Sequence, residues 1–526
     1  MKNFFQNKIN NFNIFLFFYL IIGAYLSLNV GITHDEGHSN WVWELNKKKL
    51  YNIFFNTAHD ISYLETYHGF YGIGFYLAST PLESLYKNLI NIDGINAEGK
   101  ILLLKHPIVF IFFAASGIFF RKIIFHLTND KLFSDLTTIM YLTYPYIFGH
   151  SLFNTKDIPF MSIWLINTFY IIKILDNLFI KNSTSKKDII FLGILTGYLL
   201  SLRISGILIF IEYLIFLIFY LNNLNIKFSR FLRQNIKNIS LFFTLFIFFT
   251  ILLYPSFWSD PTRFLDAFNF MSQHIQTVCT VTLGECMKAQ NLPSSYIFIW
   301  IFFKLPIVVL LGLLIFPFLE KKLFLKKKNI LILAPLICTV LTITFLLLFF
   351  NVNLYDEIRQ IIFLIPIIFI ISSVIIYNYS RKTSLIISSF FIIFFVYQNF
   401  KLFPYNYLWL NNLNIFTNVN NNFEKDYWGV STKNIANYFN KKDLDPNSCI
   451  ISNRNNGIKY FLNQKKACFK PFTELHKKNN RPFYVVFTER ALKKGVPNNC
   501  GLIHQETIQL NFSQEKIILA KIFECT

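Results

Sequence analysis

Eleven apolar stretches, each long enough to cross a lipid bilayer, constrain this sequence more than any other feature. A spanning helix needs about 20 apolar residues to cross about 30 Å of hydrocarbon. Only 15% of the 526 residues are charged, whereas about a quarter are charged in an ordinary soluble domain. The sequence therefore predicts a polytopic α-helical membrane protein with about eleven spans, at residues 12–32, 106–127, 135–153, 158–179, 188–204, 205–222, 239–256, 296–319, 329–350, 361–378 and 383–402. The fifth and sixth spans form one long run that breaks near Arg203–Gly206.

Basic residues indicate which ends of these spans face the cytoplasm, because Lys and Arg accumulate in cytoplasmic loops. Lys2 and Lys8 precede the first span, and further basic clusters lie at 121–131, 181–187, 227–237, 321–328 and 381–382. All of these fall on one side if the chain alternates through eleven spans from a cytoplasmic N-terminus. The first apolar run lacks a small-residue cleavage site, so we interpret it as an uncleaved anchor. The C-terminus is then extracytoplasmic.

The same orientation predicts the domain organisation. Residues 1–402 form a transmembrane domain with a long outside loop at 33–105, and 403–526 form a small extracytoplasmic α/β domain. The net charge of +21 then reports membrane orientation, and we expect no nucleic-acid partner. The C-terminal segment contains no GxGxxG or Walker pattern, so no nucleotide site is predicted there.

Six of the seven cysteines fall in predicted outside regions, and the seventh, Cys338, lies within a span. That segregation is typical of an oxidising compartment and predicts disulfides. The residues between Cys279 and Cys286 look like a hairpin tip that these two could join. The four cysteines of the C-terminal domain allow three connectivities. We favour Cys449–Cys468 and Cys500–Cys525, because two predicted strands would bring the latter pair together; a zinc site is the competing interpretation, although no C-x2-C pair occurs.

Two neighbouring carboxylates, Asp35 and Glu36, follow the first span directly. Like charges side by side raise the pKa of one carboxyl group, and the membrane edge adds a desolvation cost. An acid in this setting can act as a general base or hold a cation. The simpler interpretation is a polar helix cap at the membrane interface.

Histidines flank this acidic pair. His34 and His38 are four residues apart and would share a helix face, and His68 follows in the same loop. The string H-D-E-G-H matches neither H-E-x-x-H nor H-x-x-E-H, which argues against a zinc protease. No cofactor is certain, although Asp35, His38 and Asp157 could hold a divalent metal.

Further charges fall at the same predicted membrane face. Lys156 and Asp157 occupy a turn between the third and fourth spans. Arg203 interrupts an apolar run, where a basic side chain needs an anion, a partner or a polar cavity; snorkelling to the interface is the alternative. Tyr355 and Arg359 lie at the start of the tenth span.

These elements resemble the GT-C membrane glycosyltransferases. The likeness is carried by the Asp-Glu pair after the first span, the long first outside loop and the Lys-Asp-x-Pro turn after the third span. It is strongest to glycosyltransferase family 39, of the protein-mannosyltransferase and aminoarabinose-transferase type. The resemblance covers roughly residues 20–400, with a further short similarity at Asp426-Tyr-Trp-Gly429.

The resemblance implies a hexosyl- or pentosyltransferase of the cell envelope. Such an enzyme moves a sugar from a polyprenyl-phosphate donor to a lipid, glycan or protein acceptor on the outer face of the cytoplasmic (inner) membrane. The roles that it implies are a base at Asp35 with Glu36 beside it, a second acidic position at Asp157, contacts to the donor phosphate from Arg203, Lys156 and Arg359, and a substrate cavity lined by His38, His68 and Tyr355.

Two other functions are compatible with many spans and intramembrane charges. One is a transporter or flippase of lipid-linked sugars, and the other is a glycan polymerase or ligase. Transporters usually show internal repeats and helices broken at mid-membrane. We find no such repeat, and the charges of interest gather at one face, which favours the transferase.

Overall fold

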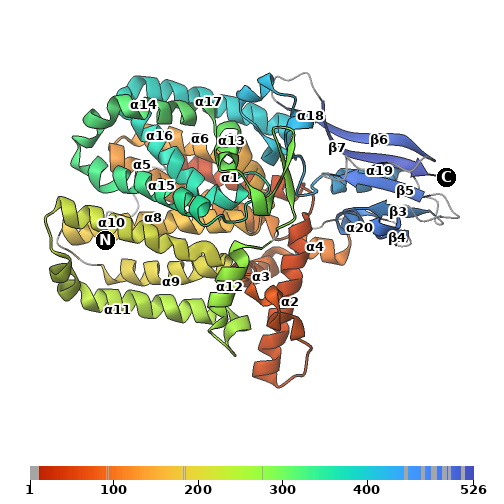
Figure 1. Cartoon of the computed structure of the whole chain (residues 1–526), viewed down its shortest axis with the longest axis horizontal. Coiled ribbons are helices and arrows are strands. Elements are labelled where there is room, and N and C mark those ends of the chain that lie inside the picture. The colour runs from red at the N-terminus through yellow and green to blue at the C-terminus, as the bar shows by residue number, and fades with distance from the viewer. Residues whose placement is uncertain are drawn as a thin grey trace.

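A long helical bundle and a small sheet domain make up the computed structural model (Figure 1). The structure describes residues 11–90, 92, 94–181, 183, 185–274, 276–442, 448–463, 468–475, 483–488, 495, 499–510 and 516–525. The bundle helices run along the long axis, whereas α2 (His34–Phe55) and α12 (Arg263–Ser272) cross it at the end nearest the sheet domain (Figure 1).

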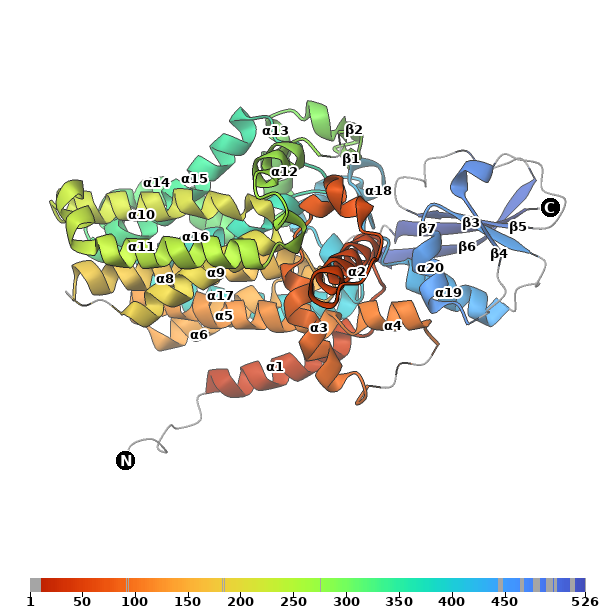
Figure 2. The ribbon, with the colours of Figure 1, turned by 90° about the horizontal axis from the view of Figure 1, so that it is seen from below.

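The bundle is built from long helices and the shorter helical segments between them. Their bounds are α1 Asn11–Ser27, α5 His106–Thr128, α6 Lys131–Thr143, α7 Pro145–Ser151, α8 Asp157–Phe179, α9 Lys186–Leu202, α10 Ile209–Asn223, α11 Phe228–Leu252, α13 Ser295–Lys304, α14 Ile307–Phe324, α15 Ala334–Phe349, α16 Ile365–Tyr379 and α17 Arg381–Leu402. Shorter helices α3 (Gly74–Tyr86) and α4 (Ala97–Leu103) lie with α2 at the end of the bundle (Figure 2).

Seven helical segments within the described residues are long and apolar enough to cross a membrane, and the bent pair α13–α14 makes up to eight. The protein is therefore a multi-pass membrane protein. The seven are Ala97–Thr128, Asp157–Phe179, Ile204–Asn223, Phe228–Leu252, Asn329–Phe349, Arg359–Tyr379 and Arg381–Leu402, and the bend between α13 and α14 measures 119°.

The other three of the eleven expected spans also contain helices, but shorter ones. Helices α1 and α9 have 17 residues each, and α6 has 13. Helix α6 ends because Tyr144 precedes a proline and leaves the helical region (φ −59°, ψ 115°). The predicted break between the fifth and sixth spans is also present, since Arg203 is extended between α9 and the 3-10 helix η3 (Ile204–Leu208).

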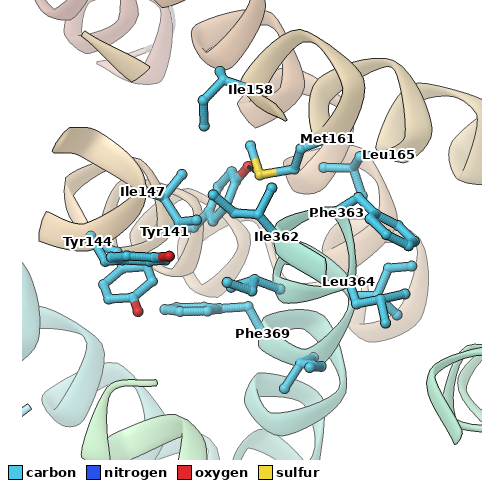
Figure 3. Close-up of a cluster of buried hydrophobic side chains, with 14 of the residues drawn as sticks. Tyr141, Tyr144, Ile147, Ile158, Met161, Leu165, Ile362, Phe363, Leu364 and Phe369 are labelled. Atoms are coloured by element: carbon cyan, nitrogen blue, oxygen red, sulfur yellow. Dashed lines mark hydrogen bonds between the residues drawn. The ribbon is translucent and has the colours of Figure 1, made fainter. Parts of the chain in front are cut away.

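The centre of the bundle is packed with large apolar side chains from α6, α7, α8, α16 and the 3-10 helix η7 (Arg359–Leu364) (Figure 3). The Tyr141 hydroxyl lies 4.0 Å from Met161 Sδ, and Phe363 packs against Trp164 with ring centroids 4.4 Å apart. In a bilayer such contacts stabilise the fold by close packing, because lipid tails are as apolar as the side chains themselves.

Three of the predicted basic loops meet at the end of the bundle away from the sheet domain. Lys328 Nζ donates to the His126 carbonyl at 3.1 Å, Lys326 Nζ donates to Asn378 Oδ1 at 2.7 Å, and Arg381 pairs with Asp130. This arrangement agrees with the one-sided basic clusters. Lys2 and Lys8 lie outside the described residues.

The C-terminal domain is a five-stranded mixed sheet of order β4-β3-β5-β7-β6. Its strands are β3 Cys449–Ser452, β4 Cys468–Lys470, β5 Phe483–Thr488, β6 Cys500–Gln509 and β7 Lys516–Cys525, and a separate hairpin pairs β1 (Cys279–Thr282) with β2 (Glu285–Lys288). Helices α19 (Thr432–Lys442) and α20 (Asn455–Phe461) cover one face of the sheet. The core under them also contains Ile32, Leu102 and Leu103 from the first long loop.

All three expected disulfides are present. Cys449–Cys468 joins two directly paired residues of β3 and β4, and Cys500–Cys525 does the same for β6 and β7. The third, Cys279–Cys286, closes the β1–β2 hairpin, and Cys338 is a free thiol. These six cysteines are thus bonded in pairs, in place of the alternative zinc site.

We predict that the end of the bundle carrying Lys326 and Arg381 faces the cytoplasm, because positive charge is retained there during insertion. A phosphatase that folds only after export should be inactive when fused after Lys326 and active when fused to the C-terminus of the chain. The reverse pattern of activities would show that the predicted orientation is inverted.

Candidate active site

The adjacent carboxylates Asp35 and Glu36 point into different surroundings. Helix α2 starts after Thr33, and Glu36 Oε1 accepts hydrogen bonds from the Thr33 backbone N–H (2.7 Å) and hydroxyl (2.8 Å). The Glu36 side chain is only 2% exposed, whereas that of Asp35 is 34% exposed. This capping box turns Glu36 into the protein and leaves Asp35 open to a ligand.

His106, at the start of α5, fixes Glu36 in this position. Its Nε2 lies 2.8 Å from Glu36 Oε2 and its Nδ1 lies 3.0 Å from the Ser27 carbonyl oxygen. The two ring nitrogens therefore link the Glu36 carboxylate to the end of α1. The Tyr76 hydroxyl of α3 donates to the Glu36 carbonyl at 3.4 Å. These bonds join the ends of α1, α2, α3 and α5 directly beneath Asp35.

Arg359 is the cation that faces the Asp35 carboxylate. Its Nη1 lies 3.5 Å from Asp35 Oδ2, and its Nε lies 3.7 Å from Asp356 Oδ2. The guanidinium also packs over the rings of Tyr355 at 5.1 Å and Trp428 at 4.4 Å. Residues from the first loop, the start of η7 and the segment before α19 therefore meet here.

A strained turn sets the direction of Arg359. Asp356 and Glu357 both have left-handed backbone, with φ of 57° and 66°, which costs a non-glycine residue about 1–2 kcal/mol. Glu357 Oε2 lies 2.8 Å from Lys304 Nζ, and both side chains are at most 1% exposed. The Asp356 backbone N–H donates to Thr280 Oγ1 at 2.9 Å. These contacts offset the strain and hold the turn.

Asp157 and Arg203 form a second pair in the same region. Arg203 Nη1 binds Asp157 Oδ1, and Asn154 Nδ2 donates to Asp157 Oδ2 at 3.0 Å. Both carboxylate oxygens are thus occupied, and the Asp157 side chain is only 3% exposed. Arg203 keeps 29% of its side chain exposed, so its guanidinium remains accessible to a further anion.

Lys156 stands between the two pairs. Its ammonium has no hydrogen-bond or ion-pair partner among the described residues, and it lies 4.9 Å from the centroid of the Tyr71 ring. Burial lowers the pKa of Lys156, and Asp35 and Asp157 act in the opposite direction. An ammonium held in this way is a ready site for an anionic group.

The surrounding cations keep the Asp35 carboxylate ionised. Burial of Asp35 acts to raise its pKa, but Lys156, followed by Arg359 and also Arg454, lowers that pKa well below its ordinary value. With Arg203, Asp157 and Asp356 included, four cations of Lys and Arg surround three carboxylates. The cluster therefore carries one positive charge in excess, which favours an anionic ligand.

The predicted cavity histidines form a neutral pair. His38 Nε2 lies 3.1 Å from His68 Nδ1, and the Tyr71 hydroxyl lies 2.8 Å from His274 Nε2 beside them. Burial, then Lys156 and His68, lowers the pKa of His38 to about 4, and burial lowers the pKa of His68. Both rings are therefore uncharged at neutral pH.

No group of three or more His, Cys, Asp or Glu side chains within the described residues is arranged to hold a metal ion. Asp157 is already held by Arg203 and Asn154, and Asp35 faces Arg359. The three residues considered for a metal thus have other neighbours, and we assign no step to a metal ion.

Several residues of this region were not singled out by sequence analysis. His106 lies within an apolar run, where a histidine signals a buried polar contact, and Lys304 and Glu357 are 53 positions apart in the sequence. Trp428 belongs to the Asp426–Gly429 segment whose likeness to the family was noted. Asp426 accepts from the backbone N–H groups of residues 430 and 431, and so shapes the turn that presents Trp428.

Comparisons with known proteins bear on the fold. No protein-family model matches the sequence, and no curated protein does. The chain is similar to the crystal structure of ArnT from Cupriavidus metallidurans bound to undecaprenyl phosphate, with 11% identity, 98% of each chain covered and a TM-score of 0.50. It is also similar to ArnT from that organism in the apo state, with 11% identity, the same coverage and a TM-score of 0.49. The first match supports the expected GT-C fold.

We predict that acid destabilises the protein partly through His38. Between pH 6.5 and about 4 the unfolded chain binds a proton that the folded His38 does not, so stability falls as the pH falls through this window. The midpoint of thermal unfolding in detergent should drop by a few degrees over that range. The His38→Gln variant should show a shallower drop, whereas His59→Gln, at an exposed position, should match the wild type. Equal pH dependence in all three proteins would contradict this account.

Proposed function

We propose that this protein transfers a hexosyl or pentosyl group from a polyprenyl-phosphate donor to an acceptor at the outer face of the cytoplasmic membrane. The observation that carries the proposal is one cluster that joins a partly exposed, ionised carboxylate, Asp35, with Lys156, Arg203 and Arg359. The cluster lies at the end of a bundle of apolar helices, where a lipid-linked headgroup would emerge from the bilayer.

The cations suit the phosphate of such a donor. Lys156 has an ammonium without a partner in the described structure, and the Arg203 guanidinium is partly exposed beside it. Charge-assisted hydrogen bonds from these groups would orient the phosphate. The ArnT structure of the same fold contains undecaprenyl phosphate, which supports a polyprenyl-phosphate partner here as well. The finer assignment, to glycosyltransferase family 39, is part of this proposal.

The proposed step breaks the bond between the anomeric carbon and the phosphate oxygen and forms a bond from that carbon to the acceptor oxygen or nitrogen. The acceptor proton passes to Asp35, and the polyprenyl phosphate departs with the bonding electron pair. Lys156, Arg203 and Arg359 stabilise the charge that grows on the leaving phosphate.

Donor binding would also prepare the base. The low pKa of Asp35 in the empty site makes its carboxylate a weak proton acceptor, because Lys156 and Arg359 favour the charged form. A phosphate bound to those cations neutralises part of their charge, and the pKa of Asp35 then rises toward its ordinary value. The base therefore gains strength only when the donor is present.

The remaining acids have positioning roles in this proposal. Glu36 anchors the first turn of α2 through its contact with His106, and Asp157 orients the guanidinium of Arg203 through their ion pair. His38, His68 and Tyr355 lie around the same cations and would contact the sugar. None of these three carries the proton transfer.

The proposed domain roles follow from this placement. Residues 1–402 provide the catalytic transmembrane domain, and 403–526 provide an extracytoplasmic domain that covers the site. Tyr407 and Trp409, just after α17, pack into the bundle core against Phe153 and Phe395. The segment that follows α17 is therefore docked on the bundle, and it holds the C-terminal domain over the end of α2.

We predict that Asp35→Asn lowers the rate of sugar transfer at least ~100-fold, the contribution typical of a general base. The measurement is transfer from a panel of labelled polyprenyl-phosphate hexoses and pentoses to native membranes. The matched control is Glu44→Gln, on the same helix, whose side chain is 47% exposed and pairs with Lys47. Binding of undecaprenyl phosphate should be retained by both variants. Equal transfer by Asp35→Asn and the wild type would eliminate Asp35 as the base.

A further inference from the structure

A cleft of about 550 Å³ lies between the start of α2 and the C-terminal domain. One wall is formed by Thr33, His34 and His38, and the opposite wall by residues 452–457, which run from the last residue of β3 into the first turn of α20. Its volume is within the range of sites that bind small ligands. Within this opposite wall, Arg454 alone also belongs to the charge cluster around Asp35.

The cleft is lined by the groups that bind sugar hydroxyls. Asn456 supplies an amide at an exposed position, and Trp41 and Trp428 supply aromatic rings. The amide of Asn453 is held by Thr488, and Asn455 Nδ2 donates to the Lys470 carbonyl at 2.8 Å. Two buried polar atoms of this lining have no hydrogen-bond partner in the described structure, namely Trp428 Nε1 and Asn455 Oδ1. Both atoms are shielded from solvent in the open cleft, and their unsatisfied state costs free energy that a rearrangement of these side chains around a hydroxyl-bearing ligand could recover.

The charges of the lining balance. Arg454 donates to the Tyr427 carbonyl oxygen at 3.3 Å, and Glu98 accepts from the Tyr460 hydroxyl at 3.3 Å. Burial lowers the pKa of both His34 and His38, so neither imidazole is charged at neutral pH. Because Arg454 already acts on Asp35, the described lining offers no further Lys or Arg to a phosphorylated ligand, which favours an uncharged one.

The cleft reaches the proposed catalytic base. His34 and His38, which line it, flank Asp35 on α2, and the His34 backbone N–H donates to the Trp428 carbonyl at 3.3 Å. Trp428 therefore lies between the cleft and Arg359, which packs on its ring at 4.4 Å. A ligand in the cleft would have one end against the first turn of α2, beside Asp35.

We infer that this cleft binds the acceptor, that the acceptor is a saccharide, and that the C-terminal domain selects it through the segment 452–457. The inference rests on the proposed function and names its acceptor class. The acceptor hydroxyl loses its proton to Asp35 as its oxygen bonds to the anomeric carbon of the donor sugar, and polyprenyl phosphate leaves.

The C-terminal domain then has a role in the reaction. It contributes Arg454, which lowers the pKa of Asp35 together with Lys156 and Arg359, and it forms the wall opposite the base. Lys433 Nζ of α19 donates to the Asn29 carbonyl at 2.8 Å, which ties this domain to the turn before α2.

The test uses the full-length protein in nanodiscs, applied to an array of neutral oligosaccharides. Serine- and threonine-rich peptides and vesicles containing a phosphorylated glycolipid form separate arms. Asn456→Trp places a large ring in the cleft at an exposed position. The matched control is Lys459→Trp, an exposed position on the same helix that does not line the cleft. Binding of undecaprenyl phosphate, measured in parallel, reports on folding and on the donor site.

The inference predicts binding to at least one neutral oligosaccharide, weakened ~10-fold or more by Asn456→Trp and unchanged by Lys459→Trp, with undecaprenyl phosphate bound equally by all three proteins. Binding of no saccharide by a protein that binds undecaprenyl phosphate would overturn the inference and leave the proposed function standing. Saccharide binding that is insensitive to Asn456→Trp would show that the saccharide does not bind in this cleft and would overturn the proposed location. Capture of the peptides or the glycolipid, blocked by Asn456→Trp, would overturn the saccharide class. Saccharide binding without any binding of undecaprenyl phosphate would overturn the proposed function.

Discussion

The hydrogen bonds that His106 makes to Glu36 and to the end of α1 are the interaction on which the site depends. Two adjacent carboxylates repel each other, and this arrangement separates them by giving one a buried hydrogen-bond partner. Glu36 is held inside by the His106 ring and the Thr33 cap, so α2 starts in one defined orientation. Asp35 is left partly exposed in the first turn, where the helix dipole also favours a negative charge. The position of the base thus follows from the burial of its neighbour.

The fold could be predicted from the sequence because a bilayer imposes simple requirements. Each expected span contains a helix, since about 20 apolar residues in lipid must satisfy their own backbone hydrogen bonds. The three disulfides were predictable from the segregation of cysteines and, for Cys500–Cys525, from strand pairing. The shorter helices were harder to delimit, because Pro145 ends α6 within an otherwise apolar run. Hydropathy alone does not detect such a break.

The site was predictable only in part. Sequence analysis could single out Asp35, Lys156, Arg203 and Arg359 because they are isolated charged residues at the ends of predicted spans. A charge next to lipid is costly, so such residues usually have a partner or a function. The separate roles of the two acids were not predictable, since they depend on His106, which is 70 positions away from Glu36 in the sequence. Nor could spacing show that the C-terminal domain reaches the base, because that contact depends on how the sheet docks against the first long loop.

The central claim is that Lys156, Arg203 and Arg359 form the binding site for a lipid-linked phosphate next to Asp35. The most direct test is an experimental structure of the protein in nanodiscs with undecaprenyl phosphate. The account predicts that the phosphate lies within hydrogen-bonding distance of Lys156 Nζ and of at least one of the two guanidinium groups, with the lipid tail along the bundle. A phosphate bound elsewhere, with Lys156 still unoccupied, would contradict it.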